Sequence, residues 1–87
     1  MFEVLVSHEA DKYYKKQDRE TKRRINKCID NLSRDPLFGL HIKKLHGELE
    51  GKHRYEVGGF RIVYEINTKS KTVEIKAIRS RGDVYKR

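Results

Sequence analysis

The most constraining feature of the sequence is a pair of alternating segments, residues 53–57 and 60–66, separated by Gly58-Gly59. Apolar and polar side chains alternate in both segments, as in antiparallel strands with one buried face. A two-residue Gly-Gly loop is typical of a type I′ turn, which requires positive φ values. The sequence therefore predicts a β-hairpin closed by a type I′ turn.

The register of this hairpin sorts its side chains onto two faces. The pairs assigned to the core are Val57 with Phe60, Tyr55 with Ile62, and His53 with Tyr64. The opposite face carries Lys52, Arg54, Glu56, Arg61, Val63 and Glu65. Glu56 is expected directly across from Arg61, with Arg54 on the diagonal. This face is predicted to hold a cluster of cations with one carboxylate within reach.

The segments before the hairpin predict one strand, two helices and a second, short strand. Residues 2–7 alternate like a strand, and Ser7 is placed to cap a short helix over 8–16. Asp18 is placed to cap a second helix that ends near Arg34, because Pro36 excludes a helical Asp35. Residues 41–45 form a possible short strand.

A last strand is predicted over 72–79, after a turn at 67–71. Regular alternation would point Arg79 toward the core together with Val73, Ile75 and Ala77. We therefore predict that this strand ends or bulges near Ile78, which would release Arg79 to the open face. Leu5, Val63 and Ile78 are expected as apolar neighbours of the cations there, a pattern that favours a surface covered by a partner.

This order of elements predicts an α+β fold, β-α-α-β-β-β(-β), with a two-helix hairpin on one face of a mainly antiparallel sheet. With 87 residues, the chain is predicted to form a single domain over 1–87. The helices need the sheet to bury their apolar positions, so the other sheet face is expected to be open.

Composition narrows the possible partners. The net charge of +8 favours phosphate backbones or an acidic protein. No apolar run exceeds three residues, and the first residues do not resemble a signal peptide, so no membrane role is predicted. A single cysteine, Cys28, excludes an internal disulfide framework and favours a reducing cytoplasm. The four histidines have no metal-motif spacing, and no cofactor is expected.

The segments KLHGELEGKHRYEVGGFRIVYEI and IRSRGDVYKR resemble the RelE/ParE superfamily of toxins, and its RelE branch in particular. The resemblance implies a ribosome-dependent endoribonuclease that cleaves mRNA and is neutralised by an acidic RelB-like antitoxin. It also implies operator DNA as a partner of the toxin–antitoxin complex alone. The positions that match the family's catalytic residues are Arg54, Arg61, Arg79 and Tyr85. Lys52 and Arg81 are predicted to bind RNA, and Arg81 matches a commonly basic position of the family.

Cleavage by ribose 2′-OH attack requires fixed cations for the charge that develops on the phosphorane oxygens, and no metal. Arginine suits this role, because its planar guanidinium is always charged. Tyr85 and Glu56 are the candidates for the general base, although Glu56 is also placed to pair with Arg61. This chain has Glu56 where several relatives have a lysine, and Ser80 where many have a histidine.

Two other functions stay open at this point. One is a ParE-like inhibitor of DNA gyrase, and the other is a non-catalytic module that binds RNA or protein. A row of cations on the second helix, Arg19, Arg23 and Lys27, fits a solvated surface as well as it fits contact with ribosomal RNA.

Overall fold

A computed structural model describes residues 1–39, 41–44 and 52–80 of the chain. The strands are β1 (Glu3–Val6), β2 (Ile42–Lys44), β3 (Lys52–Val57), β4 (Phe60–Asn67) and β5 (Thr72–Ser80). The helices are α1 (His8–Lys15) and α2 (Arg19–Arg34). This order confirms the predicted succession of elements, and the short strand predicted at 41–45 is observed as β2.

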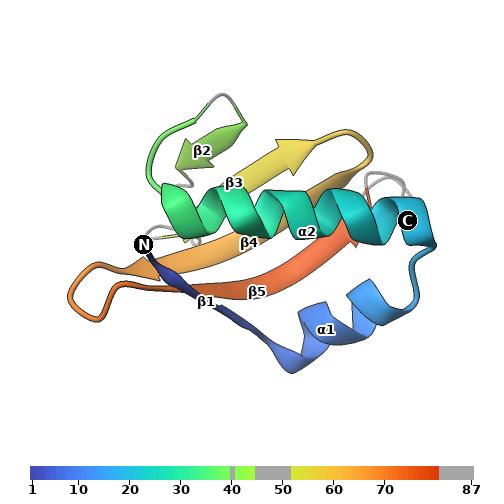
Figure 1. Cartoon of the computed structure of the whole chain (residues 1–87), viewed down its shortest axis with the longest axis horizontal. Coiled ribbons are helices and arrows are strands. Elements are labelled where there is room, and N and C mark those ends of the chain that lie inside the picture. The colour runs from blue at the N-terminus through green and yellow to red at the C-terminus, as the bar shows by residue number, and fades with distance from the viewer. Residues whose placement is uncertain (40, 45–51, 81–87) are drawn as a thin grey trace.

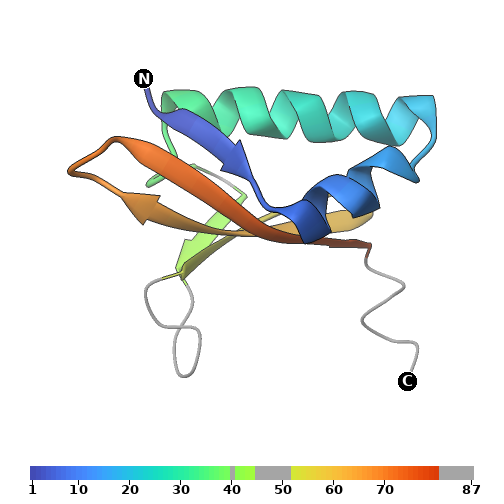
Figure 2. The same cartoon turned by 90° about the horizontal axis from the view of Figure 1, so that it is seen from below.

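The five strands form one sheet in the order β1-β5-β4-β3-β2 (Figure 1). Neighbouring strands are antiparallel except β1 and β5, which run parallel. Both helices lie on the same side of the sheet, and the other side carries no element of the described chain (Figure 2). The predicted α+β architecture with one covered face is therefore confirmed.

Each helix begins at the predicted cap. The Ser7 hydroxyl accepts a hydrogen bond from the Ala10 amide, and the Asp18 carboxylate accepts one from the Thr21 amide. Such caps satisfy backbone donors that have no partner within the helix. The second helix ends at Arg34, and Asp35 is extended, as expected for a residue before proline.

The core lies between α2 and the sheet. Ile25, Cys28 and Leu32 of α2 are buried. They contact a layer of strand residues whose fully buried members are Ile62, Tyr64, Val73, Ile75 and Ile78. The Tyr64 hydroxyl donates a 2.8 Å hydrogen bond to the carbonyl of Pro36, so the buried polar group has a partner.

The hairpin has the predicted register, with Val57 opposite Phe60, His53 opposite Tyr64 and Glu56 opposite Arg61. Its turn differs from the prediction. Gly58 has a φ of +60°, whereas Gly59 has no positive φ. One positive φ at the first central position is the pattern of a type II′ turn, which also matches the twist of the two strands. The prediction of a type I′ turn was therefore wrong.

A bulge in β5 resolves the conflict over Arg79. Val63 pairs with Ala77 and Tyr64 pairs with Ile75, so Lys76 is an extra residue in the strand. The extra residue reverses the alternation after this point. Arg79 therefore lies opposite Arg61 and shares its face, so it lies on the open face, where it was predicted. The same reversal buries Ile78, so the prediction of Ile78 on the open face was wrong.

Candidate nucleic-acid interface

The uncovered side of the sheet, called the open face below, carries charged side chains from four strands. Arg54 and Glu56 come from β3, and Arg61 comes from β4. Glu56 bridges the two arginines: Oε1 lies 3.6 Å from Arg54 Nε, and Oε2 accepts a 3.3 Å hydrogen bond from an Arg61 Nη group. Strand register thus brings together two of the predicted catalytic arginines.

The guanidinium groups of this arginine pair are only partly solvated. Each side chain is 26% exposed, and the Nε atom of each is buried without a hydrogen-bond partner. A buried donor without a partner costs free energy, and a charged donor costs more than a neutral one. An oxyanion placed between Arg54 and Arg61 would satisfy such donors, and phosphate matches the planar fork of a guanidinium.

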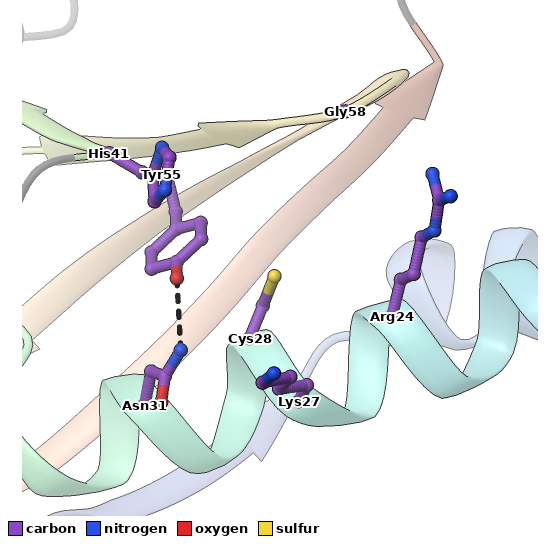
Figure 3. A pocket seen from close by; sticks show the side chains of 7 residues that line it. All are labelled: Arg24, Lys27, Cys28, Asn31, His41, Tyr55 and Gly58. Carbon is purple, nitrogen blue, oxygen red and sulfur yellow. Dashed lines mark hydrogen bonds between the residues drawn. The ribbon is translucent and has the colours of Figure 1, made fainter.

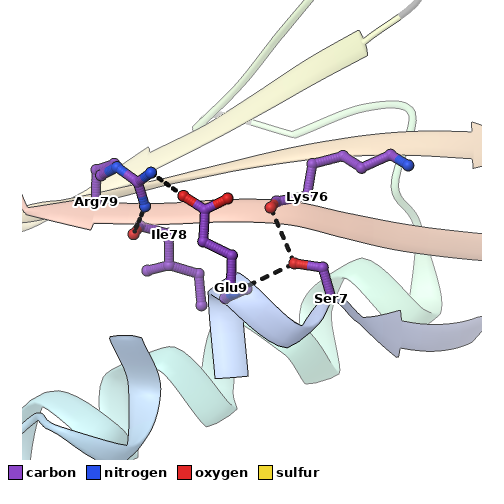
Figure 4. Close-up of polar contacts among 6 residues, drawn as sticks. Ser7, Glu9, Lys76, Ile78 and Arg79 are labelled. Atoms are coloured by element: carbon purple, nitrogen blue, oxygen red, sulfur yellow. Dashed lines mark hydrogen bonds and ion pairs between the residues drawn. The ribbon is translucent and has the colours of Figure 1, made fainter. Parts of the chain in front are cut away.

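Arg79 shares the open face with Arg61 but is held by a different carboxylate. Its guanidinium forms an ion pair with Glu9 in the first turn of α1, and it also donates a 3.0 Å hydrogen bond to the carbonyl of Ile78 (Figure 4). The hydrogen bond and the charge of Arg79 hold the pKa of Glu9 below its ordinary value. Glu9 is therefore the anionic partner of Arg79 in this structure.

Lys52 lies on the same face in a second, more balanced cluster. It pairs with Glu65 at 3.0 Å, and Lys76 pairs with both Glu65 and Glu74. Hydrogen bonding from Lys52 lowers the pKa of Glu65, and hydrogen bonding to Glu74 raises the pKa of Lys76. The charges of the two lysines and the two glutamates cancel in this cluster. The excess positive charge of the open face is therefore concentrated around Arg54 and Arg61.

Sequence reasoning missed two cations of this face. Lys43 lies directly opposite Arg54 across β2 and β3, and Lys76 reaches Glu65 from the bulge. Lys43 was missed because the short strand had no predicted register. Regular alternation already puts Lys76 on the face opposite Ile75 and Ala77, but its pairing with Glu65 was not predicted.

His53 lies on the covered side, where its ring stacks on Tyr64 at 5.6 Å between centroids. Burial lowers the pKa of His53, so the neutral imidazole is favoured.

The predicted site residues Tyr85 and Arg81 lie outside the described residues.

The described residues contain no cluster of metal-ligating side chains, and no helix among them is long and apolar enough to cross a membrane.

A family model described as "ParE toxin of type II toxin-antitoxin system, parDE" matches residues 4–85. The chain therefore belongs to this toxin family, within the RelE/ParE superfamily that the sequence resembles. Among curated protein sequences, none matches the chain.

Solved structures show the same fold. The toxin–antitoxin complex RelBE2 from Mycobacterium tuberculosis contains a chain with 27% identity and a TM-score of 0.79, aligned over 92% of this chain and 98% of that one. A RelB–RelE complex from Methanococcus jannaschii matches at 25% identity and a TM-score of 0.73, over 94% and 95%. An archaeal RelE–RelB complex from Pyrococcus horikoshii matches at 24% and 0.81, over 93% and 96%.

Proposed function

We propose that this toxin of a type II toxin–antitoxin system is a ribosome-dependent endoribonuclease that cleaves mRNA. One observation carries the proposal: Arg54 and Arg61 converge on a single carboxylate, with unpartnered buried Nε–H groups, on the uncovered face of the sheet. Such an arrangement suits an anion with several oxygens, because each guanidinium presents a fixed fork of donors.

In the proposed reaction the scissile phosphate replaces the Glu56 carboxylate between Arg54 and Arg61. The ribose 2′-oxygen attacks the adjacent phosphorus, a base takes its proton, and the bond to the 5′-oxygen breaks. The products are a 2′,3′-cyclic phosphate and a 5′-hydroxyl, whose proton comes from water or from the protonated base. The arginines stabilise the negative charge that grows on the phosphorane oxygens.

Arg79 joins this site once its guanidinium exchanges Glu9 for a phosphate oxygen. Its backbone already lies opposite Arg61, so only the side chain needs to move. Glu56 and Tyr85 are the proposed candidates for the base, and Lys52 and Arg81 are proposed to bind flanking RNA.

The proposed partners follow from the same class. An acidic RelB-like antitoxin would neutralise the net charge of +8, and operator DNA would be bound by the toxin–antitoxin complex alone. Ribosome and mRNA place the proposed activity in the cytoplasm.

Inhibition of DNA gyrase is the second candidate function, because the matching family model is described as a ParE toxin. The arginine cluster favours ribonuclease activity, since a gyrase inhibitor has no phosphodiester to cleave on this face.

The test uses ribosomes programmed with a defined mRNA, and it follows cuts in the mRNA. We expect Arg61→Ala to lower the cleavage rate by about 10²–10³-fold, the usual cost of removing one such donor. Lys12→Ala, which removes one exposed positive charge from α1, is the matched control and should cleave normally. Loss of DNA supercoiling by gyrase without any mRNA cut would replace the ribonuclease proposal with the ParE-like one.

A further inference from the structure

A pocket of about 440 Å³ lies on the covered side of the sheet, between α2 and β3 (Figure 3). Its walls come from Arg24, Lys27, Cys28 and Asn31 of α2, from His41 before β2, and from Tyr55 and Gly58 of the hairpin. The Tyr55 side chain points to the helices, away from the arginines of the open face. The pocket is therefore separate from the proposed catalytic site.

The floor of the pocket is neutral and held in place. Tyr55 and Cys28 are 6% and 4% exposed, and the Tyr55 hydroxyl accepts a 3.0 Å hydrogen bond from the Asn31 amide. Burial raises the pKa values of both Cys28 and Tyr55. An aromatic ring and a thiol thus offer an apolar surface that does not need to rearrange when a ligand binds.

The rim of the pocket is positive. Arg24 pairs with Glu20 through Nε at 3.5 Å, and its Nη1 atom reaches the hairpin turn, since a Cβ on Gly58 would lie 3.3 Å from it. Within the described chain no carboxylate lies within ion-pair distance of Lys27, and none lines the pocket. Two cations one helical turn apart therefore border an apolar floor: Arg24 is paired with Glu20, and Lys27 has no acidic partner among the described residues.

This combination fits an amino-acid segment better than a nucleic-acid backbone. RNA binding relies on cations that track successive phosphates, with stacking on exposed rings. Here the cations number two, and the Tyr55 ring is buried at the bottom of a pocket. A peptide with a carboxylate beside an apolar side chain could pair with the cations of the rim and cover the apolar floor at the same time.

We propose that this pocket anchors an acidic segment of the antitoxin, with one Asp or Glu carboxylate between Arg24 and Lys27 and an adjacent apolar side chain over Tyr55. The inference rests on the acidic antitoxin of the proposed function and is independent of the ribonuclease activity. It assigns binding to the helix-covered side, so this contact would lie away from the open-face arginines.

The experiment uses the full chain and the protein encoded by the neighbouring open reading frame. The double variant R24E/K27E reverses both rim charges, and R19E/R23E makes the same change in net charge on the same helix without touching the pocket. By calorimetry, we expect R24E/K27E to weaken binding by at least about 30-fold, and R19E/R23E by no more than about 3-fold. All four positions border solvent, and thermal unfolding of both variants would verify folding.

A compensating charge substitution in the neighbouring protein tests whether its carboxylate binds at this pocket. One Asp→Lys or Glu→Lys substitution in the neighbouring protein should restore tight binding to R24E/K27E while weakening binding to the wild-type chain. Equal losses in both double variants, or no loss in either, would overturn the pocket assignment while leaving the antitoxin in place. A wild-type chain that does not bind the neighbouring protein would contradict the proposed partner itself. Loss of ribosomal cleavage in R24E/K27E with unchanged antitoxin binding would assign the pocket to RNA instead.

Discussion

Glu56 is the carboxylate that pairs with both Arg54 and Arg61 on the open face. Two guanidinium groups share its two oxygens, and their Cα positions are fixed by strand register. Without this carboxylate, Arg54 and Arg61 would repel each other across a small, partly desolvated surface. In the proposed reaction, the residue that stabilises the arginine pair in the free protein is thus the one that the scissile phosphate displaces.

Replacing Glu56 by Gln should therefore strengthen RNA binding. We expect E56Q to bind a 2′-O-methyl RNA, which cannot be cleaved by 2′-OH attack, about 3–10-fold more tightly than wild type, because no internal carboxylate competes for the arginines. Fluorescence anisotropy would measure this affinity. The matched control is E20Q, which removes the same charge from the exposed side of α2. Equal gains in E56Q and E20Q would mean that net charge alone, and not this site, controls binding.

Sequence reasoning reached the Glu56–Arg61 pair because a two-residue loop fixes the register of a hairpin, and register fixes neighbours. It did not reach the Glu9–Arg79 pair. These residues are 70 positions apart, and their contact depends on how α1 packs beside β5, which periodicity does not determine. No local pattern predicted this contact of Glu9, because it is set by tertiary packing.

Among the elements, the hairpin turn shows that the residues of a loop do not by themselves determine its turn type. Gly-Gly suits either mirror-image turn, and the structure uses positive φ at Gly58 alone. Gly58 is also crowded, because Arg24 Nη1 would lie 3.3 Å from an added Cβ, whereas Gly59 has open space around it.

The two glycines should therefore respond differently to alanine. We expect Gly58→Ala to lower the free energy of unfolding by about 1–2 kcal/mol, since an L-residue resists positive φ, and Gly59→Ala to cost less. Urea denaturation of both variants provides the comparison. A larger loss for Gly59→Ala would show that the positive φ belongs to the second position.

Ser7 joins the first helix to the bulge. Its hydroxyl accepts from the Ala10 amide and donates a 2.9 Å hydrogen bond to the carbonyl of Lys76, the extra residue of β5 (Figure 4). The cap of α2 at Asp18 accepts from Thr21 and is exposed. One hydroxyl thus supports a helix start and a strand irregularity together.

Removing this hydroxyl should cost more than removing an ordinary cap. Loss of an N-cap costs about 1 kcal/mol, and the Lys76 carbonyl also loses a donor, so we expect Ser7→Ala to lower the free energy of unfolding by about 2 kcal/mol. Asp18→Ala is the control, with an expected loss of about 1 kcal/mol. Equal losses in urea denaturation would show that the bond to β5 contributes nothing.

The sequence predicted the bulge only indirectly, because regular alternation in the last strand would have buried Arg79. Regular alternation buried an arginine, and burying an unpaired charge is costly, so an irregularity near Ile78 was required. Its position was not determined, because a shift by one residue changes which apolar side chain is buried with it. This is why Arg79 was placed correctly and Ile78 was not.

For the molecule as a whole, the sheet separates two positive surfaces. Arg54 and Arg61 lie on the open face, whereas Arg24 and Lys27 border a pocket on the covered side. With a net charge of +8, the chain would therefore present anionic partners with two surfaces that differ in chemistry, one rich in guanidinium donors and the other with an apolar floor. Mutations on one surface are expected to leave the other intact, which makes the two proposals separable.

The buried core also sets how stability depends on pH. Burial raises the pKa of the Cys28 thiol from about 9 to about 11, and it raises the pKa values of Tyr64 and Tyr55 as well. A group whose pKa is higher in the folded state stabilises the fold fully below its unfolded pKa. That stability is lost as pH rises toward the folded pKa, because the unfolded chain releases the proton first.

We therefore expect the free energy of unfolding to fall as pH rises from about 9 to about 11, with Cys28 responsible for the first part, since its unfolded pKa is the lowest of the three. Urea denaturation at a series of pH values measures the slope. Cys28→Ala removes the thiol, so between pH 9 and 10 its slope should be smaller by about one proton, even though the lost packing lowers its stability at every pH. A slope identical to that of wild type would show that the thiol titrates equally in the folded and unfolded chains, and that it therefore faces solvent instead of the core beneath α2.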